Sequence, residues 1–563
     1  MLDYGASIHK QTGHMIMRHQ NIILLTGLMG LLYLAALFFF GIVLNGDALG
    51  YLSDGIALIE HHRNMPNVIM WTTIESGRLS PSPDIDYPNK LFSIGYAALF
   101  LAAQKHSAIM LVPGFLAFVV GMYCCIRYST NFLDYRGTIS FILFKFFLFL
   151  PPLLIVNRTD LYAWSIMMAI LLIAHEKPRQ YCLIGVLLAI ASSIRAQCYT
   201  LLPFVPFILA EPNTNPEDTY LKKMLRITVP FLVVVAGWNA FLHFYITPDF
   251  SRPVTSASFY INEIKTLFVP KLNPLKLYPL IMDGLYNIFM TYYGPFSVIF
   301  LLSLLPYFKK YRSPFLWQAL LFAIPVFLLP YIQYENANDV RYLWYGLFFT
   351  SLYIWQFVEQ YKKTFPCLVF LQIAMAAAEI TLFATGPMSS IIGNREKSSR
   401  NKQEVKTRFL GDDFSNLSSD VAKHLSENAV ILAPGMDYGA ANLRGAWLHV
   451  FLNTQNIVQT IAYSKFLSGG HNNLIDAIII MNHEKCDVHY KHFWNYAPGW
   501  FENALMRDII IDDLGNVFVA VSENGKLDPE KTFYKIYVRT LSDKLRHTLM
   551  QRPLMGLSAS HGE

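Results

Sequence analysis

Residues 21–44 read NIILLTGLMGLLYLAALFFFGIVL, an uncharged apolar run, and residues 45–54 follow at once as NGDALGYLSD. A helix that crosses a bilayer needs about 20 consecutive apolar residues, so the run predicts a first transmembrane helix. It is too long for the apolar part of a cleaved signal peptide and lacks a small-residue exit, which predicts a signal anchor. Asp47 then lies at a membrane boundary, where an ionisable side chain is costly unless it has a partner or a function.

The composition of the whole chain also indicates a membrane protein. Of the 563 residues, 54% are hydrophobic and 15% are charged, and the mean hydropathy is +0.34. Soluble domains carry about a quarter charged residues. The net charge of +6 is small, and no nucleic-acid partner is expected.

The cysteines show no C-x-x-C spacing, so we expect them to be small packing residues.

A series of apolar runs occupies the first two-thirds of the chain, and basic residues between the runs set their direction. The runs are approximately 21–44, 91–104, 108–126, 138–156, 161–174, 181–193, 199–210, 227–247, 286–307, 314–333, 343–358 and 365–386. Basic clusters lie at Lys177/Arg179, Lys222/Lys223/Arg226, Lys309/Lys310/Arg312 and Lys362/Lys363. The positive-inside rule places these clusters, and the N-terminal segment, in the cytoplasm.

Clusters on the same side of a membrane must be separated by an even number of crossings. This holds if the run 91–104, which follows Pro88 and ends in Gln104-Lys105-His106, is an interfacial or half-inserted helix. The prediction is then a polytopic α-helical membrane protein with about eleven transmembrane helices. In this topology the loop 45–90, the turns after residues 156, 194 and 333, the loop 248–285 and everything after residue 386 are expected to face outside. A topology with about twelve crossings, which puts most basic clusters outside, is the alternative.

The chain changes character near residue 390 and becomes polar. Short β-branched runs at 430–432, 477–480, 509–511 and 517–521 predict strands, and 420–425 and 441–452 predict helices. The segment from Arg539 to Glu563 is expected to be a polar helix and a loose tail. The predicted division is therefore a cytoplasmic segment 1–20, a transmembrane domain 21–389 with a first outer loop 45–90, an extracytoplasmic α/β domain 390–540, and a tail 541–563.

Ionisable and aromatic side chains gather in the predicted outer loops. They are Asp47, Tyr51, Asp54 and Lys90 in the first loop, Arg158 and Asp160 after the run 138–156, Arg195 after the run 181–193, and Glu335, Arg341 and Tyr342 around the turn 334–342. The turns are short, so these groups are expected to converge at one membrane surface. Carboxylates there suit acid–base work, and arginines can bind a phosphate through two hydrogen bonds.

Simpler roles are open to several of these residues. Asp47 and Asp160 could cap the helices that follow them. Arg158 and Arg195 could anchor helix ends by extending into the interface. Arg341 could pair with an acidic side chain of its own turn. These roles compete with, or accompany, the chemical ones.

The sequence contains no clear cofactor site. Asp84-Ile85-Asp86 has the D-x-D form of a metal site, although this spacing is common by chance. A divalent metal is therefore the cofactor that the sequence leaves open. No P-loop or dinucleotide-binding glycine motif is present.

The order of the outer motifs resembles the GT-C class of polytopic glycosyltransferases, and the layout is similar to that of the protein O-mannosyltransferases and the lipid A aminoarabinose transferases. The similar motifs, in chain order, are Asp47-Ala48-Leu49-Gly50-Tyr51, Tyr87-Pro88-Asn89-Lys90, Asp160, Ile194-Arg195-Ala196-Gln197 and Arg341-Tyr342. The resemblance covers most of residues 20–386. The chain departs from the family where Ala48, in place of a second acidic residue, follows Asp47, and where a lysine-proline-proline run is missing around Lys90.

What the resemblance implies is an inverting transfer of a sugar from a polyprenyl-phosphate donor to an acceptor hydroxyl. Asp47 would be the base, and Asp160 would orient the sugar or assist the base. The departing phosphate would be bound by Arg341, Lys90, Arg195, Arg158 and Tyr342, and the acceptor or sugar would be oriented by Tyr51, Asp54 and Glu335.

The resemblance also implies partners and a location. The acceptor would be a lipid, a glycan or a protein, membrane lipids would surround the helices, and the enzyme would lie in the bacterial inner (plasma) membrane. A polysaccharide polymerase or ligase is an alternative, because such enzymes use similar lipid donors. A secondary transporter or lipid flippase is a further alternative, although no internal repeat of the kind found in transporters is evident.

Overall fold

The computed structural model describes the helices and strands of the chain and the turns next to them. The described residues are 19–40, 51–52, 55–56, 58–60, 68–70, 90–103, 111–143, 159–177, 180–195, 198, 202, 205, 219–245, 274–286, 289, 293, 295–307, 315–320, 323, 327, 344–360, 367, 370–371, 373–374, 415–426, 429–434, 456–460, 475–482, 507–524 and 533–540. The chain forms two compact units. Unit 1 comprises Met1–Ala48 and Asp86–Phe409, and unit 2 comprises Leu49–Ile85 and Leu410–Glu563.

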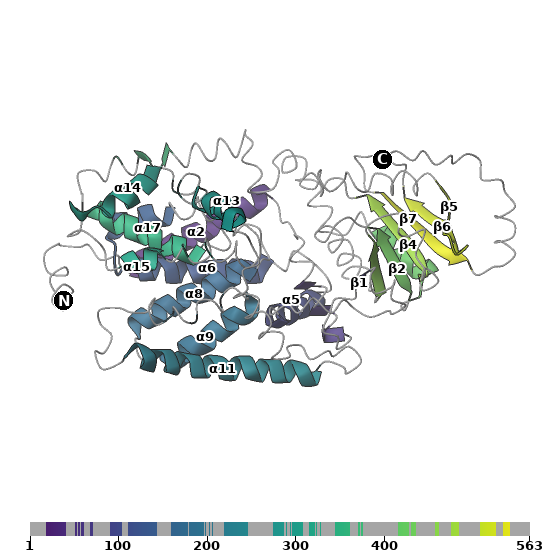
Figure 1. Cartoon of the computed structure of the whole chain (residues 1–563), viewed down its shortest axis with the longest axis horizontal. Helices are drawn as coiled ribbons and strands as arrows, with labels where there is room; N and C mark the ends of the chain where they lie inside the picture. The colour runs from purple at the N-terminus through teal and green to yellow at the C-terminus, as the bar shows by residue number, and fades with distance from the viewer. Residues whose placement is uncertain are drawn as a thin grey trace. The chain divides into compact units, whose positions relative to one another are not determined.

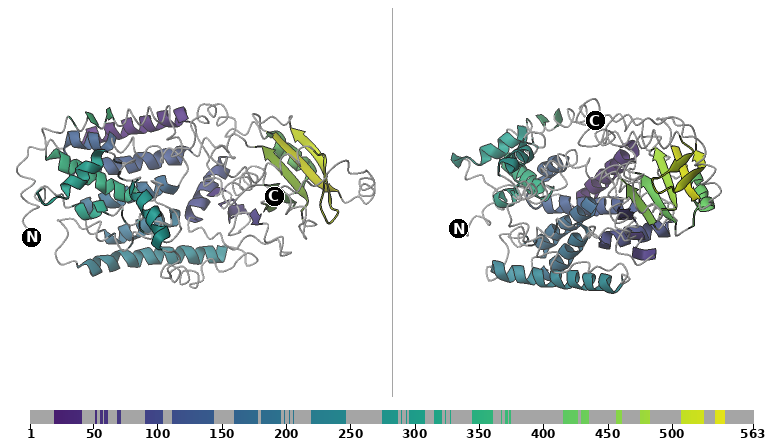
Figure 2. Two further views of the ribbon diagram at one scale, coloured as in Figure 1. Left: turned by 45° about the horizontal axis from the view of Figure 1, so that its top comes forward. Right: turned by 45° about the vertical axis from the view of Figure 1, so that its right-hand side comes forward.

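Unit 1 is helical over its described residues (Figure 1). Its helices are α2 (His19–Phe40), α5 (Lys90–Ala102), α6 (Leu111–Ser129), α8 (Thr159–Glu176), α9 (Tyr181–Ile194), α11 (Tyr220–Tyr245), α13 (Pro274–Tyr286), α14 (Pro295–Ser303), α15 (Leu316–Ala319) and α17 (Trp344–Glu359). The helices α2, α6, α8, α9 and α11 pack in that order, each against the next, and α5 packs on α9 (Figures 1 and 2).

The helices α6 and α8 run in the same direction. Near the start of both, the rings of Phe118 and Trp164 stack with centroids 6.3 Å apart. Near their ends, the rings of Tyr128 and His175 meet edge to face at 6.0 Å. The run 138–156, predicted to cross in the opposite direction, lies between the two helices in the sequence.

The helices α9 and α11 also run in the same direction. The Arg226 guanidinium lies over the Tyr181 ring at 5.9 Å, close to the start of both helices. Further along, Gly185 faces α11, where an added Cβ would lie 3.3 Å from the Cβ of Pro230. The run 199–210, predicted to cross in the opposite direction, lies between these two helices in the sequence.

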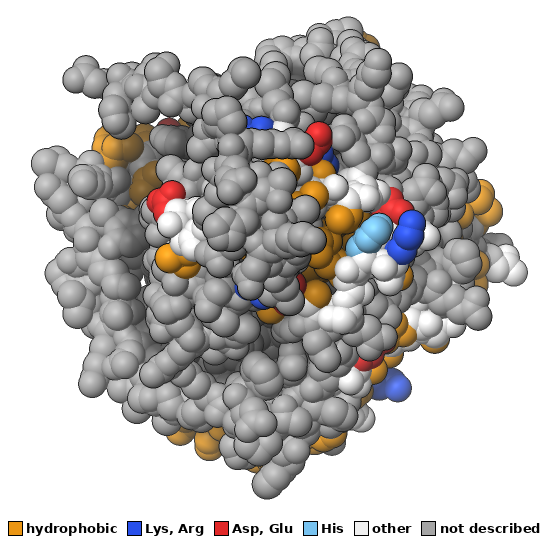
Figure 3. Space-filling view, turned by 90° about the vertical axis from the view of Figure 1, so that its right-hand side faces the viewer, with side chains coloured by type: hydrophobic (Ala, Val, Ile, Leu, Met, Phe, Trp, Pro, Cys, Tyr) orange, Lys and Arg blue, Asp and Glu red, His pale blue; other side chains and the backbone are white. Residues whose placement is uncertain are grey.

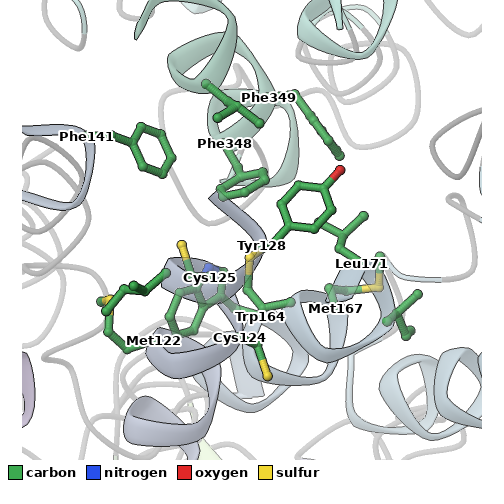
Figure 4. Packing of buried hydrophobic residues seen from close by; sticks show 14 of the residues in the cluster. Met122, Cys124, Cys125, Tyr128, Phe141, Trp164, Met167, Leu171, Phe348 and Phe349 are labelled. Carbon is green, nitrogen blue, oxygen red and sulfur yellow. The ribbon is translucent and has the colours of Figure 1, made fainter. Parts of the chain in front are cut away.

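The core of unit 1 is a large apolar cluster that joins several helices. Figure 4 shows Met122, Cys125 and Tyr128 of α6 facing Trp164 of α8, with Phe348 of α17 beside them. Cys124 and Cys125 are buried among these side chains as free thiols. The expectation of small packing residues is confirmed for these two and for the buried Cys198, whereas Cys182 and Cys367 are exposed and do not agree with it.

Three helices of unit 1 carry large apolar side chains on their outer faces. These side chains are Ile23, Leu24, Leu28 and Leu31 of α2, Val112, Leu116 and Val120 of α6, and Leu221, Leu225, Val229, Leu232 and Val233 of α11, all about half exposed or more. Among the described residues, two helical stretches are long and apolar enough to cross a bilayer, Val112–Ser129 in α6 and Tyr220–Leu242 in α11. Exposed apolar side chains on these helices are suited to contact with lipid or with a protein partner.

Polar contacts lie where α6, α8 and α17 end. The Nε of Arg127 is 2.7 Å from Oε1 of Glu176, and both side chains are more than a third exposed. The backbone N–H of Asp134 donates to Oε1 of Glu359 at 3.0 Å, while Oδ1 of Asp134 accepts from the N–H of Gly137 at 2.7 Å. Asp134 thus caps the helix that begins after it.

One predicted span overlaps two described helices. The run 286–307 contains the last residue of α13, which ends at Tyr286, and the short helix α14, which begins at Pro295. Proline is favoured at the first position of a helix, because its fixed φ suits the helix and its missing N–H would be unpaired there. The runs 161–174, 181–193 and 343–358 agree closely with α8, α9 and α17.

Unit 2 contains a seven-stranded mixed sheet in the order β1-β3-β2-β4-β7-β6-β5. The strands are β1 (Val68–Met70), β2 (Val430–Pro434), β3 (Asn456–Thr460), β4 (Ala477–Asn482), β5 (Ile509–Ile511), β6 (Val517–Asn524) and β7 (Phe533–Thr540), and helix α21 (Ser415–His424) packs against β7. The first four strands in the spatial order are parallel, and β7, β6 and β5 add an antiparallel meander. On the face drawn in Figure 3, apolar side chains near the centre are bordered by acidic and basic ones.

The sheet corrects and extends the predictions for this region. The predicted strands at 430–432, 477–480, 509–511 and 517–521 are confirmed as β2, β4, β5 and β6. Arg539 and Thr540, predicted to begin a polar helix, are instead the end of β7. Lys535 explains why this strand was hard to recognise: it is a charged residue inside β7, yet its side chain is 3% exposed and pairs with Asp508 at 3.0 Å.

The strand β1 comes from the predicted first outer loop, far from the other strands in sequence. Val68, Ile69 and Met70 pair in parallel with Ile457, Val458 and Gln459 of β3. Part of the loop 45–90 is thereby built into the C-terminal sheet. The hairpin at the opposite edge turns at Gly515, whose φ of 76° suits glycine.

Candidate functional site

A buried ion pair joins the beginning of α8 to the end of α9. The Nε of Arg195 lies 2.8 Å from Oδ1 of Asp160, and the two side chains are 9% and 6% exposed. Nη1 of Arg195 also donates a hydrogen bond to Oγ1 of Thr159 at 3.1 Å. Removing two charges from water is costly, and mutual attraction and further hydrogen bonds offset that cost only when the geometry is good.

The backbone holds Arg195 in place at the point where α9 ends. Its φ of −142° and ψ of 115° are extended, so the helix stops there. Its N–H donates to the carbonyl of Ala191 at 2.8 Å, and its own carbonyl accepts from the N–H of Cys198 at 3.0 Å. The guanidinium is therefore carried by a residue that is fixed on both sides, and its orientation depends on α8.

Small side chains allow α8 and α9 to approach each other next to the pair. Ala163 of α8, Ala191 of α9 and Cys198 form a buried cluster, with Ile166 packed against it. Larger side chains here would separate the helices and with them the carboxylate and the guanidinium. Asp160 lies in the first turn of α8, where a negative charge also interacts favourably with the helix dipole.

The helix α5 brings a third element to this place. The ring of Phe92 lies 5.0 Å from the ring of Tyr162, and 5.0 Å from that of Tyr96. Tyr162 follows Asp160 by two residues, so the first turn of α5 adjoins the first turn of α8. Lys90 is the first residue of α5. The start of α5 therefore lies near the ion pair in space.

The predicted site residues fall into three groups. Asp160 and Arg195 are brought together, and Lys90 begins the neighbouring helix. Tyr51 is a half-buried residue of unit 2. The remaining predicted residues lie outside the part of the chain that the structure describes: Asp47, Asp54, Arg158, Glu335, Arg341 and Tyr342.

The geometry decides between two interpretations of Arg195. An interfacial anchor would extend its charged end into water, whereas the Arg195 side chain is buried and paired with Asp160. Sequence reasoning did not give Thr159 or Tyr162 a role in the site. Their positions within two residues of Asp160 are the available signal, because a buried charge needs neighbouring hydrogen-bonding groups.

The arrangement has the chemical character of an anion or sugar site within an apolar helical unit. A carboxylate can accept hydrogen bonds from hydroxyls, and a guanidinium can donate to carboxylate or phosphate oxygens. Among the described residues no group of three or more His, Cys, Asp or Glu side chains is placed to hold a metal. Asp84 and Asp86, the residues of the D-x-D sequence, lie outside those residues.

Comparisons with known proteins add no name to this site. A scan against protein-family models gives no match, and a search of curated proteins gives none either. The function is therefore argued from the residues and their geometry.

Proposed function

We propose that the chain is a polytopic membrane glycosyltransferase that moves a sugar from a polyprenyl phosphate to an acceptor hydroxyl on the extracytoplasmic face. The observation that carries this proposal is the buried Asp160–Arg195 pair. Buried charges in an apolar helical unit are expensive, and they are typical of functional sites. The neighbouring helix α5 begins with Lys90, so three of the expected residues gather at one end of the helices.

The outer surface of unit 1 supports a membrane location. The half-exposed leucine and valine side chains of α2, α6 and α11 are suited to contact with lipid. The relative directions of α6, α8, α9 and α11 fit a chain that crosses a membrane between them, in the topology with about eleven crossings and equally in the one with about twelve. In that topology, Asp160 and Arg195 lie at the outer ends of α8 and α9, and Arg127 and Glu176 lie at the inner ends of α6 and α8.

The proposed chemistry needs no nucleotide, because the leaving group is already a phosphate. Asp47 accepts the proton of the attacking hydroxyl while the acceptor oxygen forms a bond to the anomeric carbon. The bond from that carbon to the phosphate oxygen breaks on the opposite side, which inverts the configuration. Positive charge preorganised near the phosphate stabilises the developing anion, and we assign this role to Arg341 together with Lys90, Arg195 and Arg158.

The role of Asp160 follows from its contact with Arg195. Because the carboxylate is buried and paired, it suits the orientation of a neutral polar group better than proton transfer to bulk solvent. We therefore assign Asp160 to the sugar and Asp47 to the acceptor. Arg195 is fixed by Asp160 and Thr159, so loss of Asp160 would also move the guanidinium.

A transfer assay on the purified full-length protein tests the proposal. The donor is a radiolabelled polyprenyl-phosphate sugar, and the readout is label transferred to lipid, glycan or protein in a membrane extract. Asp47→Ala and Asp47→Asn are each expected to lower the rate by about 10²–10⁴-fold, the range for loss of a general base. Near-normal transfer by both variants would refute the base, and no transfer by wild type with any donor sugar would refute the function.

A further inference from the structure

Buried hydroxyl groups without a hydrogen-bond partner gather on the three helices around the Asp160–Arg195 pair. Ser93 and Tyr96 lie on α5, Tyr162 on α8 and Ser192 on α9, and none of their hydroxyls has a partner among the described residues. Buried polar groups in proteins are nearly always hydrogen-bonded, so each exception needs an explanation. Four exceptions on adjoining helices point to a shared cause.

The burial of these side chains excludes bulk water as their usual partner. Ser93 and Ser192 are 0% exposed, and Tyr96 is 4% exposed. The phenols of Tyr96 and Tyr162 are electrostatic neighbours, and the ring of Phe92 lies 5.0 Å from each of their rings. Hydroxyl groups and aromatic surface are thus combined between α5 and α8.

The set adjoins the ion pair along the sequence of each helix. Tyr162 follows Asp160 by two residues, and Ser192 precedes Arg195 by three, so both lie within one helical turn of the charged residue. Ala191, the neighbour of Ser192, contacts Ala163 of α8. The hydroxyls, the carboxylate and the guanidinium therefore belong to the same end of the helices.

We propose that the hydroxyls of Ser93, Tyr96, Tyr162 and Ser192 bind the ring hydroxyls of the donor sugar, next to Asp160. This inference rests on the proposed function and adds the part of the protein that recognises the sugar. Each protein hydroxyl can donate one hydrogen bond and accept others, which matches a polyhydroxylated ring. The prenyl chain offers no hydrogen-bonding group, and the phosphate requires cations, so neither matches this set.

A site of this kind has a predictable specificity. When buried protein groups are built to pair with substrate hydroxyls, an analogue without those hydroxyls leaves them unpaired and is strongly rejected. The aromatic rings of Phe92, Tyr96 and Tyr162 supply rigid apolar area with polar tips. We therefore expect the sugar, rather than the lipid, to provide the discrimination at this end of the helices.

The test compares lipid binding by wild type and by variants that remove one hydroxyl while keeping the shape of the side chain. The variants are Tyr96→Phe, Tyr162→Phe and Ser192→Ala, each as full-length protein in detergent. The probes are decaprenyl phosphate without a sugar and decaprenyl phosphate carrying mannose, glucose, galactose or aminoarabinose. Each variant is expected to bind the bare lipid as wild type does and to lose about threefold to tenfold in affinity for the preferred sugar lipid.

Thr228→Val is the matched control. Thr228 of α11 also has a hydroxyl without a partner among the described residues. It lies in the part of α11 that packs near Gly185 rather than near Arg195. The melting temperature of each ligand-free variant should equal or exceed that of wild type, since no internal hydrogen bond is lost. Unchanged sugar-lipid affinity in all three variants, or an equal loss for the bare lipid, would overturn the inference and leave the proposed function standing. Wild type that binds no sugar lipid better than the bare lipid would also overturn the inference, whereas the proposed function is refuted only when wild type transfers no sugar in the transfer assay.

Discussion

At the scale of single residues, the Asp160–Arg195 pair contrasts with the Arg127–Glu176 pair. Both join α8 to a neighbouring segment with an N–O distance below 3 Å, but the first pair is almost completely buried and the second is more than a third exposed. The physical consequences of losing one partner differ accordingly. A buried charge without its partner keeps the full cost of desolvation, whereas an exposed charge is rehydrated.

Asp160→Leu is therefore expected to lower the free energy of unfolding by about 3–5 kcal/mol, because it leaves the Arg195 guanidinium buried without its carboxylate. The matched control Glu176→Leu should cost about 1 kcal/mol or less. Thermal unfolding of the two proteins in the same detergent measures the difference. A double variant, Asp160→Leu with Arg195→Met, should regain much of the lost stability while sugar transfer stays abolished.

Equal losses for Asp160→Leu and Glu176→Leu would contradict the burial argument. A double variant that recovers transfer as well as stability would show that the pair is structural and has no part in the chemistry. The two readouts, stability and transfer, thus separate the energetic role of the pair from its proposed functional role.

At the scale of elements, helix packing depends on places where two backbones come close. Gly185 of α9 is such a place, because an added Cβ would be 3.2 Å from the carbonyl carbon of Ile227 and would overlap its oxygen. The contact is with backbone, which cannot rotate away. Pro230, inside α11, is at the same contact, and proline disturbs the helical hydrogen bonds of the preceding turn.

Gly185→Ala is accordingly expected to separate α9 from α11 and to destabilise the protein by about 1–3 kcal/mol, the usual cost of overpacking. Gly237→Ala in α11 is the control, since no atom lies within 4 Å of its added Cβ. That substitution should be neutral or should stabilise by up to about 1 kcal/mol, because alanine favours helix. Melting temperatures of the two variants test the expectation, and a Gly185→Ala protein as stable as wild type would refute the close approach.

The elements show how much of the fold the sequence could predict. The runs that became α8, α9 and α17 are continuous, apolar and bounded by polar residues, so their pattern alone locates them. The strands β1 and β3 were not predicted, because each is short and gains its stability from pairing with a distant segment. The strand β7 was not predicted for a similar reason. It contains the charged residue Lys535, whose partner Asp508 lies on another part of the chain.

The candidate site was predictable in the same uneven way. Asp160 and Arg195 could be singled out as charges beside apolar runs, and a shared side of the membrane made their proximity reasonable. Their direct contact, and the part played by Thr159, depend on how α8 and α9 pack. Packing is set by Ala163 and Ala191, small residues whose sequence context carries no chemical signal.

At the scale of the whole molecule, the pairing of β1 with β3 constrains the topology. If the helices of unit 1 cross a membrane as proposed, two segments of one sheet must lie on the same side of it, so the loop that contains β1 and the C-terminal domain would share a compartment. The number of crossings between them would then be even. If the run 91–104 is interfacial, the remaining predicted runs between residues 105 and 386 give an even number, whereas a crossing at 91–104 would make it odd.

A cysteine pair tests both the register and the compartment. Ile69 and Val458 are direct partners in the parallel pairing of β1 with β3, and because successive residues of a strand alternate between the two faces of a sheet, directly paired positions belong to the same face. Ile69→Cys with Val458→Cys, in a chain whose native cysteines are replaced, is expected to form a disulfide in intact cells. The extracytoplasmic space is oxidising and the cytoplasm is reducing, so the bond also reports the side of the membrane. A shift in mobility on a non-reducing gel, reversed by reductant, is the measurement.

Ile69→Cys with Gln459→Cys is the control, since a displacement of one residue along a strand moves the side chain to the opposite face. It should remain reduced under the same conditions. If the direct pair stays reduced in cells but joins when the purified protein is oxidised, the sheet is correct and the domain lies in the cytoplasm. That outcome would reverse the sidedness of Asp160 and Arg195 and would remove the extracytoplasmic acceptor from the proposed reaction. If neither cysteine pair forms a disulfide under any condition, β1 is not paired with β3. The structure then gives no reason for an even number of crossings between the loop and the C-terminal domain.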